Sequence, residues 1–211
     1  MVYNIYAGIN RVVDALNGKI LTMLHGEEFS LLSATRLCSD DTRMQNLMST
    51  EFLNSLRSPG VPEHELKLKL NYLCMVTRNI LVQDRLMNNT KVIVREIGRH
   101  LVTVKTLMEH RQFALPRIIF RFTLPRSGLM IERRQFPLRL CYAITVNKSQ
   151  GLTLDRVCLD LREHPFAHGQ LYVRASRVRN RSNILVLTLD DHLHHTCALT
   201  KNIVYQDLLP S

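Results

Sequence analysis

Two nearly continuous apolar runs in the last third of the chain place the strongest constraint on its fold. LCYAITV at 140–146 and NILVLTL at 183–189 contain no charged residue and lack the alternation of a strand with one wet face. Such runs are typical of a parallel sheet that is covered on both faces. Between them, GQLYVRASRV at 169–178 predicts a short helix. The alternation of strand and helix predicts an α/β fold.

The N-terminal part predicts a helix over residues 10–24. Asn10 is a suitable N-cap, and HGEE at 25–28 ends the helical spacing of apolar side chains. The side chains expected on the buried face are Val13, Leu16, Ile20, Leu21 and Leu24.

The middle of the chain predicts a β-rich insertion. RSPGVPEHE at 57–65 contains two prolines and a glycine, which exclude regular structure and indicate a domain boundary near residue 60. LKLKL then alternates as a strand does. Three further runs rich in β-branched residues, YLCMVT, KVIVREI and HLVTVKTLM, predict a small antiparallel barrel or sheet over 72–108.

The charge balance favours an anionic partner. The chain has 28 Lys and Arg against 18 Asp and Glu, a net charge of +10 and a pI near 9.7, which predicts nucleic acid more readily than a membrane surface. No apolar run approaches the ~20 residues of a spanning helix, and the N-terminus lacks a secretory signal, so an intracellular protein without a membrane partner is expected. Five scattered cysteines, mostly in apolar runs, predict reduced core thiols.

Most of the excess positive charge lies in residues 111–150, which hold eight basic residues and one acid, Glu132. In RIIFRF at 117–122 the arginines alternate with apolar residues, so a strand could bury one side and present guanidinium groups on the other. This pattern predicts that Arg121 contacts DNA. A solvated basic face is the alternative. A second cluster, YVRASRVRNR at 172–181, contains no acid.

The polar turn Lys148, Ser149, Gln150 and Gly151 is suited to hold phosphate. No G-x-x-x-x-G-K-[ST] nucleotide loop occurs in the 211 residues, however. HLHHTC at 192–197 groups His and Cys, but the spacing fits no common zinc pattern, so no metal site is predicted.

Several spaced motifs together resemble the Pif-type superfamily-one DNA helicases, which include the helicase part of Helitron transposons. NRVVDALNGKILTMLHGEE is similar to the start of their second RecA-like domain, and EFLNSLRSPGVPEHELKLKL followed by TRNI to the start of their 2B insertion. RRQFPLRLCYAITVNKSQGLTLD resembles helicase motif V, HGQLYVRASRVRNRSNILVL resembles motif VI, and TKNIVYQDLL resembles the C-terminal end. The resemblance covers nearly the whole chain.

This resemblance implies a second RecA-like domain over 1–50 and 135–211, interrupted by a β-rich 2B insertion at 51–134. It implies that Arg177 is an arginine finger and that Gln150 and Gly151 approach ATP. It also implies that Thr145, Lys148 and Ser149 face DNA or the nucleotide cleft.

The resemblance further implies a role in 5′ to 3′ unwinding of DNA, with single-stranded DNA and a separate or upstream phosphate-loop domain as partners. A nuclear or mitochondrial location would follow. ATP and Mg²⁺ are expected only when a first RecA-like domain is supplied, and the chain alone is expected to bind neither.

Departures from the family pattern leave other functions open. Arg174 and Ala175 interrupt motif VI, and Asn71 and Asn89 stand where the family has glycine, Asn89 at a position suited to positive φ. Together with the missing phosphate-loop domain, these changes suggest two alternatives. The chain is then a catalytically inactive nucleic-acid-binding module, or a degenerate remnant derived from a transposon.

Overall fold

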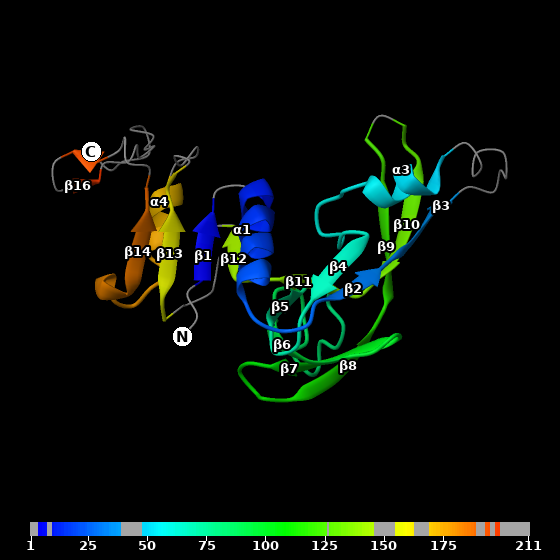
Figure 1. Cartoon of the computed structure of the whole chain (residues 1–211), viewed down its shortest axis with the longest axis horizontal. Helices are drawn as coiled ribbons and strands as arrows, with labels where there is room; N and C mark the ends of the chain where they lie inside the picture. The colour runs from blue at the N-terminus through cyan, green and yellow to red at the C-terminus, as the bar shows by residue number, and fades with distance from the viewer. Residues whose placement is uncertain are drawn as a thin grey trace. The chain divides into compact units, whose positions relative to one another are not determined.

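The computed structural model describes residues 4–7, 10–38, 48–125, 127–145, 155–162, 169–188, 193–194 and 197–198. The chain divides into two compact units. The parallel-sheet unit consists of Met1–Met23 and Cys141–Ser211, and the β-rich unit consists of Leu24–Leu140. Figure 1 shows the elements of each.

A four-stranded parallel sheet forms the first unit, in the order β12-β1-β13-β14 (Figure 1). Its strands and helices are β1 Asn4–Ala7, α1 Asn10–Met23, β12 Ala143–Thr145, β13 Val157–Asp160, α4 Gln170–Ala175, a 3₁₀ turn Arg181–Asn183 and β14 Ile184–Leu187. A short pair, β15 Leu193–His194 and β16 Cys197–Ala198, follows. The predicted α/β architecture and both predicted helices are confirmed.

Helix α1 buries a polar residue that the apolar pattern does not predict. Val13, Asn17 and Leu21 are its buried residues, and they share one face at a spacing of four. The Asn17 side-chain amide donates to the Ala143 carbonyl at 3.0 Å and accepts from the Ala143 N–H at 2.9 Å. Asn17 therefore satisfies both backbone groups of Ala143 on β12, as a neighbouring strand does.

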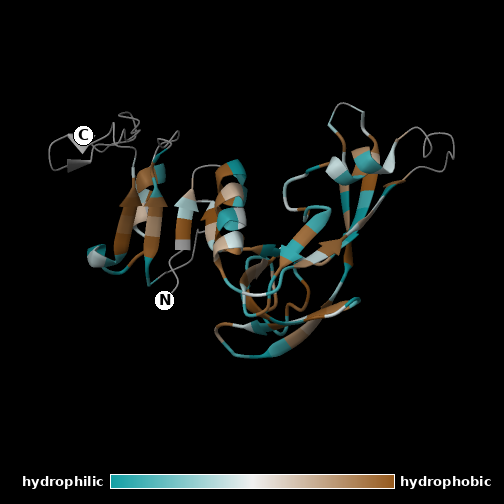
Figure 2. Ribbon diagram, viewed as in Figure 1, coloured by the Kyte–Doolittle hydropathy of each residue, from teal (hydrophilic) through white to brown (hydrophobic). Residues whose placement is uncertain are grey.

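The two apolar runs behave differently from the prediction. LCYAITV is not one strand, because Leu140 ends β11 Leu138–Leu140, which pairs antiparallel in the other unit, whereas β12 pairs parallel with β1. The change of partner at 141–142 breaks the strand. In the second run, β14 lies at the edge of the sheet and its residues 185–187 are 41–50% exposed, although β13 and β14 are mostly hydrophobic (Figure 2). The expectation of a strand covered on both faces is wrong for β14.

A five-stranded antiparallel sheet forms the core of the β-rich unit, in the order β11-β5-β6-β7-β8. Strands β5 Leu73–Val76, β6 Lys91–Ile97 and β7 Leu101–Thr106 coincide with the three predicted runs, and β8 is Gln112–Pro116. Their alternate side chains enclose a core that includes Val92, Val94, Val102 and Val104. The predicted antiparallel sheet is confirmed.

A three-stranded antiparallel sheet completes this unit, in the order β3-β10-β9. Its strands are β3 Ala34–Cys38, β10 Met130–Gln135 and β9 Ile118–Thr123, and helix α3 Thr50–Ser55 packs on it through Leu37, Leu53 and Ile131. The Ser49 hydroxyl caps α3 by accepting from the Phe52 N–H. A further antiparallel pair is β2 Phe29–Leu32 with β4 Glu65–Leu68. The irregular segment predicted at 57–65 precedes β4, and only its last residue, Glu65, lies in the strand.

Three further predictions concern the backbone at Asn89, the cysteines and membrane-spanning helices. Asn71 and Asn89 have φ of 64° and 70°, so the positive φ predicted at Asn89 is confirmed. Cys38, Cys74, Cys141 and Cys158 are free, and the last three are buried. Among the described residues, no helix is long and apolar enough to cross a membrane.

Candidate functional site

The carboxyl edge of the parallel sheet carries the first group of predicted site residues. Thr145 ends β12 beside Ala7, the last residue of β1, and Asp160 ends β13 beside Leu187 on β14. Ligands of open α/β sheets bind outside this edge. Thr145 is half-buried there, while the buried Asp160 carboxylate accepts two N–H groups of Arg162 at 2.8 and 2.6 Å. The Thr145 hydroxyl and the ion pair between Asp160 and Arg162 therefore lie at this edge.

The polar turn predicted to hold phosphate lies outside the described residues. This applies to Lys148, Ser149, Gln150 and Gly151, and to the side chain of Arg174. Their predicted contacts with DNA and ATP stay predictions.

Arg177 follows helix α4 and is half-buried. Its Nε donates to the Val173 carbonyl at 3.1 Å, and its NH2 group donates to the Ser176 hydroxyl at 3.1 Å. These bonds hold the guanidinium against the end of its own helix. Gly169, at φ 67°, precedes α4 as its N-cap in a conformation that favours glycine.

Arg121 lies on β9 in the other unit, and the structure groups it with residues distant in sequence. Arg36 on β3, Glu132 on β10 and Arg121 on β9 are neighbours in register. Arg121 Nε donates to Glu132 Oε1 at 2.8 Å, and Arg36 donates to Oε2 through Nε at 2.8 Å and NH2 at 2.6 Å. The two arginine side chains are 67% and 76% exposed, whereas that of Glu132 is 7% exposed. These hydrogen bonds hold the pKa of Glu132 below its usual range.

Every second residue of strands β3, β9 and β10 lies on the same side of the three-stranded sheet. Residues on this side form an open surface, which we call the arginine face. Alternation along β10 puts Arg134 on the same side as Glu132, and Arg134 is exposed. The neighbouring side chains Ile119 on β9 and Met130 on β10 are 52% and 46% exposed on that side. The arginine face is Arg36, Ile119, Arg121, Met130, Glu132 and Arg134.

The opposite side of the same sheet buries Arg133, which is 1% exposed. Its guanidinium donates to the Leu53 and Asn54 carbonyls at 3.0 and 3.2 Å, to the Pro62 carbonyl at 3.1 Å and to the Thr35 hydroxyl at 3.1 Å. Burial lowers the pKa of Arg133. The Leu53 and Asn54 carbonyls belong to the last turn of α3, so Arg133 caps that helix with a positive charge.

The basic stretch at 111–150 is therefore not one surface. Besides the buried Arg133, Arg111 is ion-paired with Asp84 at 2.6 Å, and the Arg117 guanidinium packs 4.2 Å from the centre of the Phe136 ring. Arg121 is exposed, as the alternation in RIIFRF predicts, and Arg134 is also exposed. Sequence reasoning missed Arg36, which lies outside the stretch and joins it only through β3–β10 pairing.

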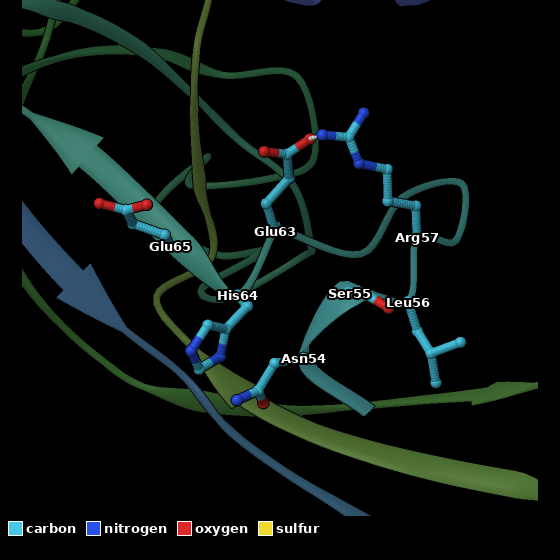
Figure 3. Close-up of a pocket in the computed structure, with 7 residues that line it drawn as sticks. All are labelled: Asn54, Ser55, Leu56, Arg57, Glu63, His64 and Glu65. Atoms are coloured by element: carbon cyan, nitrogen blue, oxygen red, sulfur yellow. Dashed lines mark ion pairs between the residues drawn. The ribbon is translucent and has the colours of Figure 1, made fainter. Parts of the chain in front are cut away.

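An open hollow of about 390 Å³ lies beside the end of α3 (Figure 3). Arg57 and Glu63 on its wall form an ion pair at 3.2 Å, and His64 Nδ1 lies 2.9 Å from the Ser33 hydroxyl. Burial and the nearby charge of Arg133 lower the pKa of His64. The ion pair of Arg57 with Glu63 and the contact of His64 Nδ1 with Ser33 engage part of this polar lining. Its lining residues are Asn54, Ser55, Leu56, Arg57, Glu63, His64 and Glu65.

Comparisons with known proteins agree with this architecture. Residues 51–97 match the family described as DNA helicase Pif1, 2B domain. The ATP-dependent DNA helicase PIF1 of Xenopus laevis is 29% identical over 206 residues, which cover 86% of this chain and 32% of that protein.

Two solved structures show the same fold. The Pif1 helicase from Candida albicans matches with a TM-score of 0.67 and 22% identity over 90% of this chain and 46% of that one. Bacteroides Pif1 bound to single-stranded DNA matches with a TM-score of 0.64 and 22% identity over 87% of this chain and 40% of that one.

The fold is that of a RecA-like α/β helicase domain with an inserted β-rich 2B domain. The resemblance to the Pif-type DNA helicases is confirmed, and the relatives named above are Pif1 helicases. The chain spans about a third of the length of the Xenopus relative, 32%.

Proposed function

We propose that the chain supplies the second RecA-like half of an ATP-dependent DNA helicase that moves 5′ to 3′. In this proposal residues 1–50 and 135–211 belong to the RecA-like part, and 51–134 form the 2B-type insertion. The compact units divide the chain at other points, because residues 24–50 and 135–140 pack with the β-rich unit. The observation that carries the proposal is the common fold with Bacteroides Pif1, which was solved bound to single-stranded DNA. The match of residues 51–97 to the Pif1 2B domain supports the position of the insertion.

On the nucleotide side, we assign Arg177 the role of an arginine finger and Gln150 and Gly151 a contact with ATP. The chain lacks a glycine-rich phosphate loop, and the described residues contain no group of three His, Cys, Asp or Glu side chains that could hold a metal ion. These residues therefore do not fit a complete site for ATP and Mg²⁺. A phosphate-loop domain, upstream or separate, must supply the rest of that site.

On the DNA side, the proposed contacts are Arg121, Thr145, Lys148 and Ser149. Hydroxyl, ammonium and guanidinium groups bind phosphate oxygens without reading sequence, so weak binding with little base preference is expected. A DNA partner would place the protein in the nucleus or in mitochondria.

Hydrolysis measurements test the helicase role. The chain alone should not hydrolyse ATP, whereas the chain fused after the phosphate-loop domain of a Pif1 relative should hydrolyse it when DNA is added. In the fusion, Arg177→Ala should lower the rate by ~10³ or more while ATP binding is retained. Arg179→Ala, a change of the same kind in the same basic cluster, is the control. Equal rates for the two variants would refute the role of Arg177.

A second candidate function is a catalytically inactive nucleic-acid-binding module. The exposed arginine face favours it. If the fusion binds DNA but never hydrolyses ATP, the inactive module is the better description.

A further inference from the structure

We propose that the arginine face binds the phosphate backbone of single-stranded DNA, with Arg36, Arg121 and Arg134 as the contacts and Glu132 as the residue that positions two of them. This inference rests on the proposed DNA partner and goes beyond it, since it defines a platform on the β-rich unit and adds Arg36 and Arg134.

The geometry of the sheet spaces the three positive charges. Adjacent strands lie about 4.8 Å apart, so the backbones of Arg36 and Arg121, one strand to either side of Glu132, are about 10 Å apart. Arg134 is two residues beyond Glu132 on β10, about 7 Å along the strand. The backbones of the three arginines therefore lie within about 10 Å of one another, one on each strand of the sheet.

Glu132 orients Arg36 and Arg121 while leaving them available. Its two oxygens accept from the Nε side of each guanidinium, and both arginine side chains are at least two-thirds exposed, at 76% and 67%. The remaining N–H groups of each fork match phosphate geometry. Since the side chains are already held, less conformational entropy is lost when they bind. With Arg134, three positive charges oppose one negative charge.

The apolar residues on the same face favour a single strand over a duplex. Ile119 and Met130 are about half exposed, at 52% and 46%. Ile119 pairs with Arg134 across the strands, and Met130 lies two residues from Glu132 along β10. Bases of a single strand can turn toward such side chains and toward guanidinium planes, whereas duplex bases are already stacked. An acidic peptide is the competing occupant. The overall net charge of +10 and the common fold with a DNA-bound Pif1 favour DNA.

Fluorescence anisotropy of the 211-residue chain with a labelled oligothymidylate of about 15 nucleotides tests the platform. At about 50 mM salt, Arg134→Glu and Arg36→Glu should each weaken binding roughly tenfold and make the logarithmic salt slope shallower by about 0.7. Arg95→Glu is the matched control, because Arg95 is exposed on β6, where its side chain donates to Asn71 Oδ1 at 2.6 Å. It should change affinity less than about twofold.

Two further measurements identify the ligand. Ile119→Ser should weaken binding to the single strand without changing the salt slope, and a duplex or an oligoglutamate should compete poorly. Circular dichroism confirms that each variant is folded, and Arg134→Glu breaks no hydrogen bond or ion pair seen among the described residues.

The outcomes separate this inference from the proposed function. If the chain binds DNA but the Arg36 and Arg134 variants match the Arg95 control, the platform is refuted and the DNA partner stands. If a duplex or oligoglutamate competes equally well, the platform does not select single strands and the inference fails. If the folded chain binds no DNA at low salt, both proposals fail.

Discussion

Replacing Arg133 by methionine should destabilise the β-rich unit strongly, although arginine on a strand is ordinarily a surface residue. The side chain is 1% exposed and donates four hydrogen bonds, three of them to backbone carbonyls. Methionine fills a similar volume but leaves those carbonyls without a donor. Each unsatisfied buried acceptor costs about 1–3 kcal/mol.

Two effects reduce the total cost. Asn54 borders the open hollow beside α3, so water can reach part of the vacated site. Methionine also avoids the cost of burying a charge. We therefore expect a loss of about 3 kcal/mol, near the lower end of the sum for three carbonyls. With a typical m-value of about 2 kcal/mol/M, the urea midpoint should fall by about 1.5 M.

Hydrogen exchange of β10 as a function of urea measures the effect in the correct part of the molecule, because the two compact units need not unfold together. Arg134→Met is the matched control. It makes the same chemical change one residue along the strand, on the exposed side, and should shift stability by less than about 0.5 kcal/mol. If the two variants are equally stable, Arg133 does not cap α3 in solution and the reasoning is wrong.

Three other substitutions have clear expected outcomes. Asn17→Ala should cost about 2–4 kcal/mol in thermal unfolding because both backbone groups of Ala143 lose their partner; an unchanged melting temperature would contradict this. Asn89→Ala should cost about 1 kcal/mol at φ 70°, whereas Asn89→Gly should cost nothing, and equal melting temperatures would exclude backbone strain as the cause. The Glu132 pKa is depressed, so the stability from its ionised form is present above the unfolded-state pKa of about 4.3 and is lost as pH falls through the lower folded value. In urea unfolding, the free energies of unfolding of wild type and Glu132→Gln should therefore become equal as the pH is lowered. A difference in this free energy that does not change with pH would refute the assignment.

Local patterns in the sequence were sufficient to predict most of the elements. Helix α1 and strands β5, β6 and β7 coincide with predicted segments because side-chain periodicity and chain-breaking residues act over a few neighbours. The positive φ of Asn89 was predictable for the same reason, since backbone sterics are local. The family resemblance predicted the RecA-like fold with a 2B insertion, which no periodicity could establish.

Long-range pairing was beyond the sequence patterns. Arg36 joins the arginine face through Glu132, 96 residues away, and Asn17 completes the bonding of Ala143, 126 residues away. The division of LCYAITV between β11 and β12 likewise depends on which strand each half pairs with. A linear pattern contains no information about partners at such separations.

Arg133 and Arg134 differ in a way that strand periodicity predicts only in part. The period of a strand determines that their side chains lie on opposite sides of β10. It does not determine which side is covered. Helix α3 and the 57–64 segment pack on the Arg133 side and supply carbonyls that hydrogen-bond the guanidinium, so that arginine is buried while Arg134 stays exposed. Alternation along β10 is therefore a property of the local sequence. Packing between distant segments selects the arginine that stabilises the fold and leaves the other exposed, because a charge is buried only where the packed chain supplies its hydrogen-bond partners.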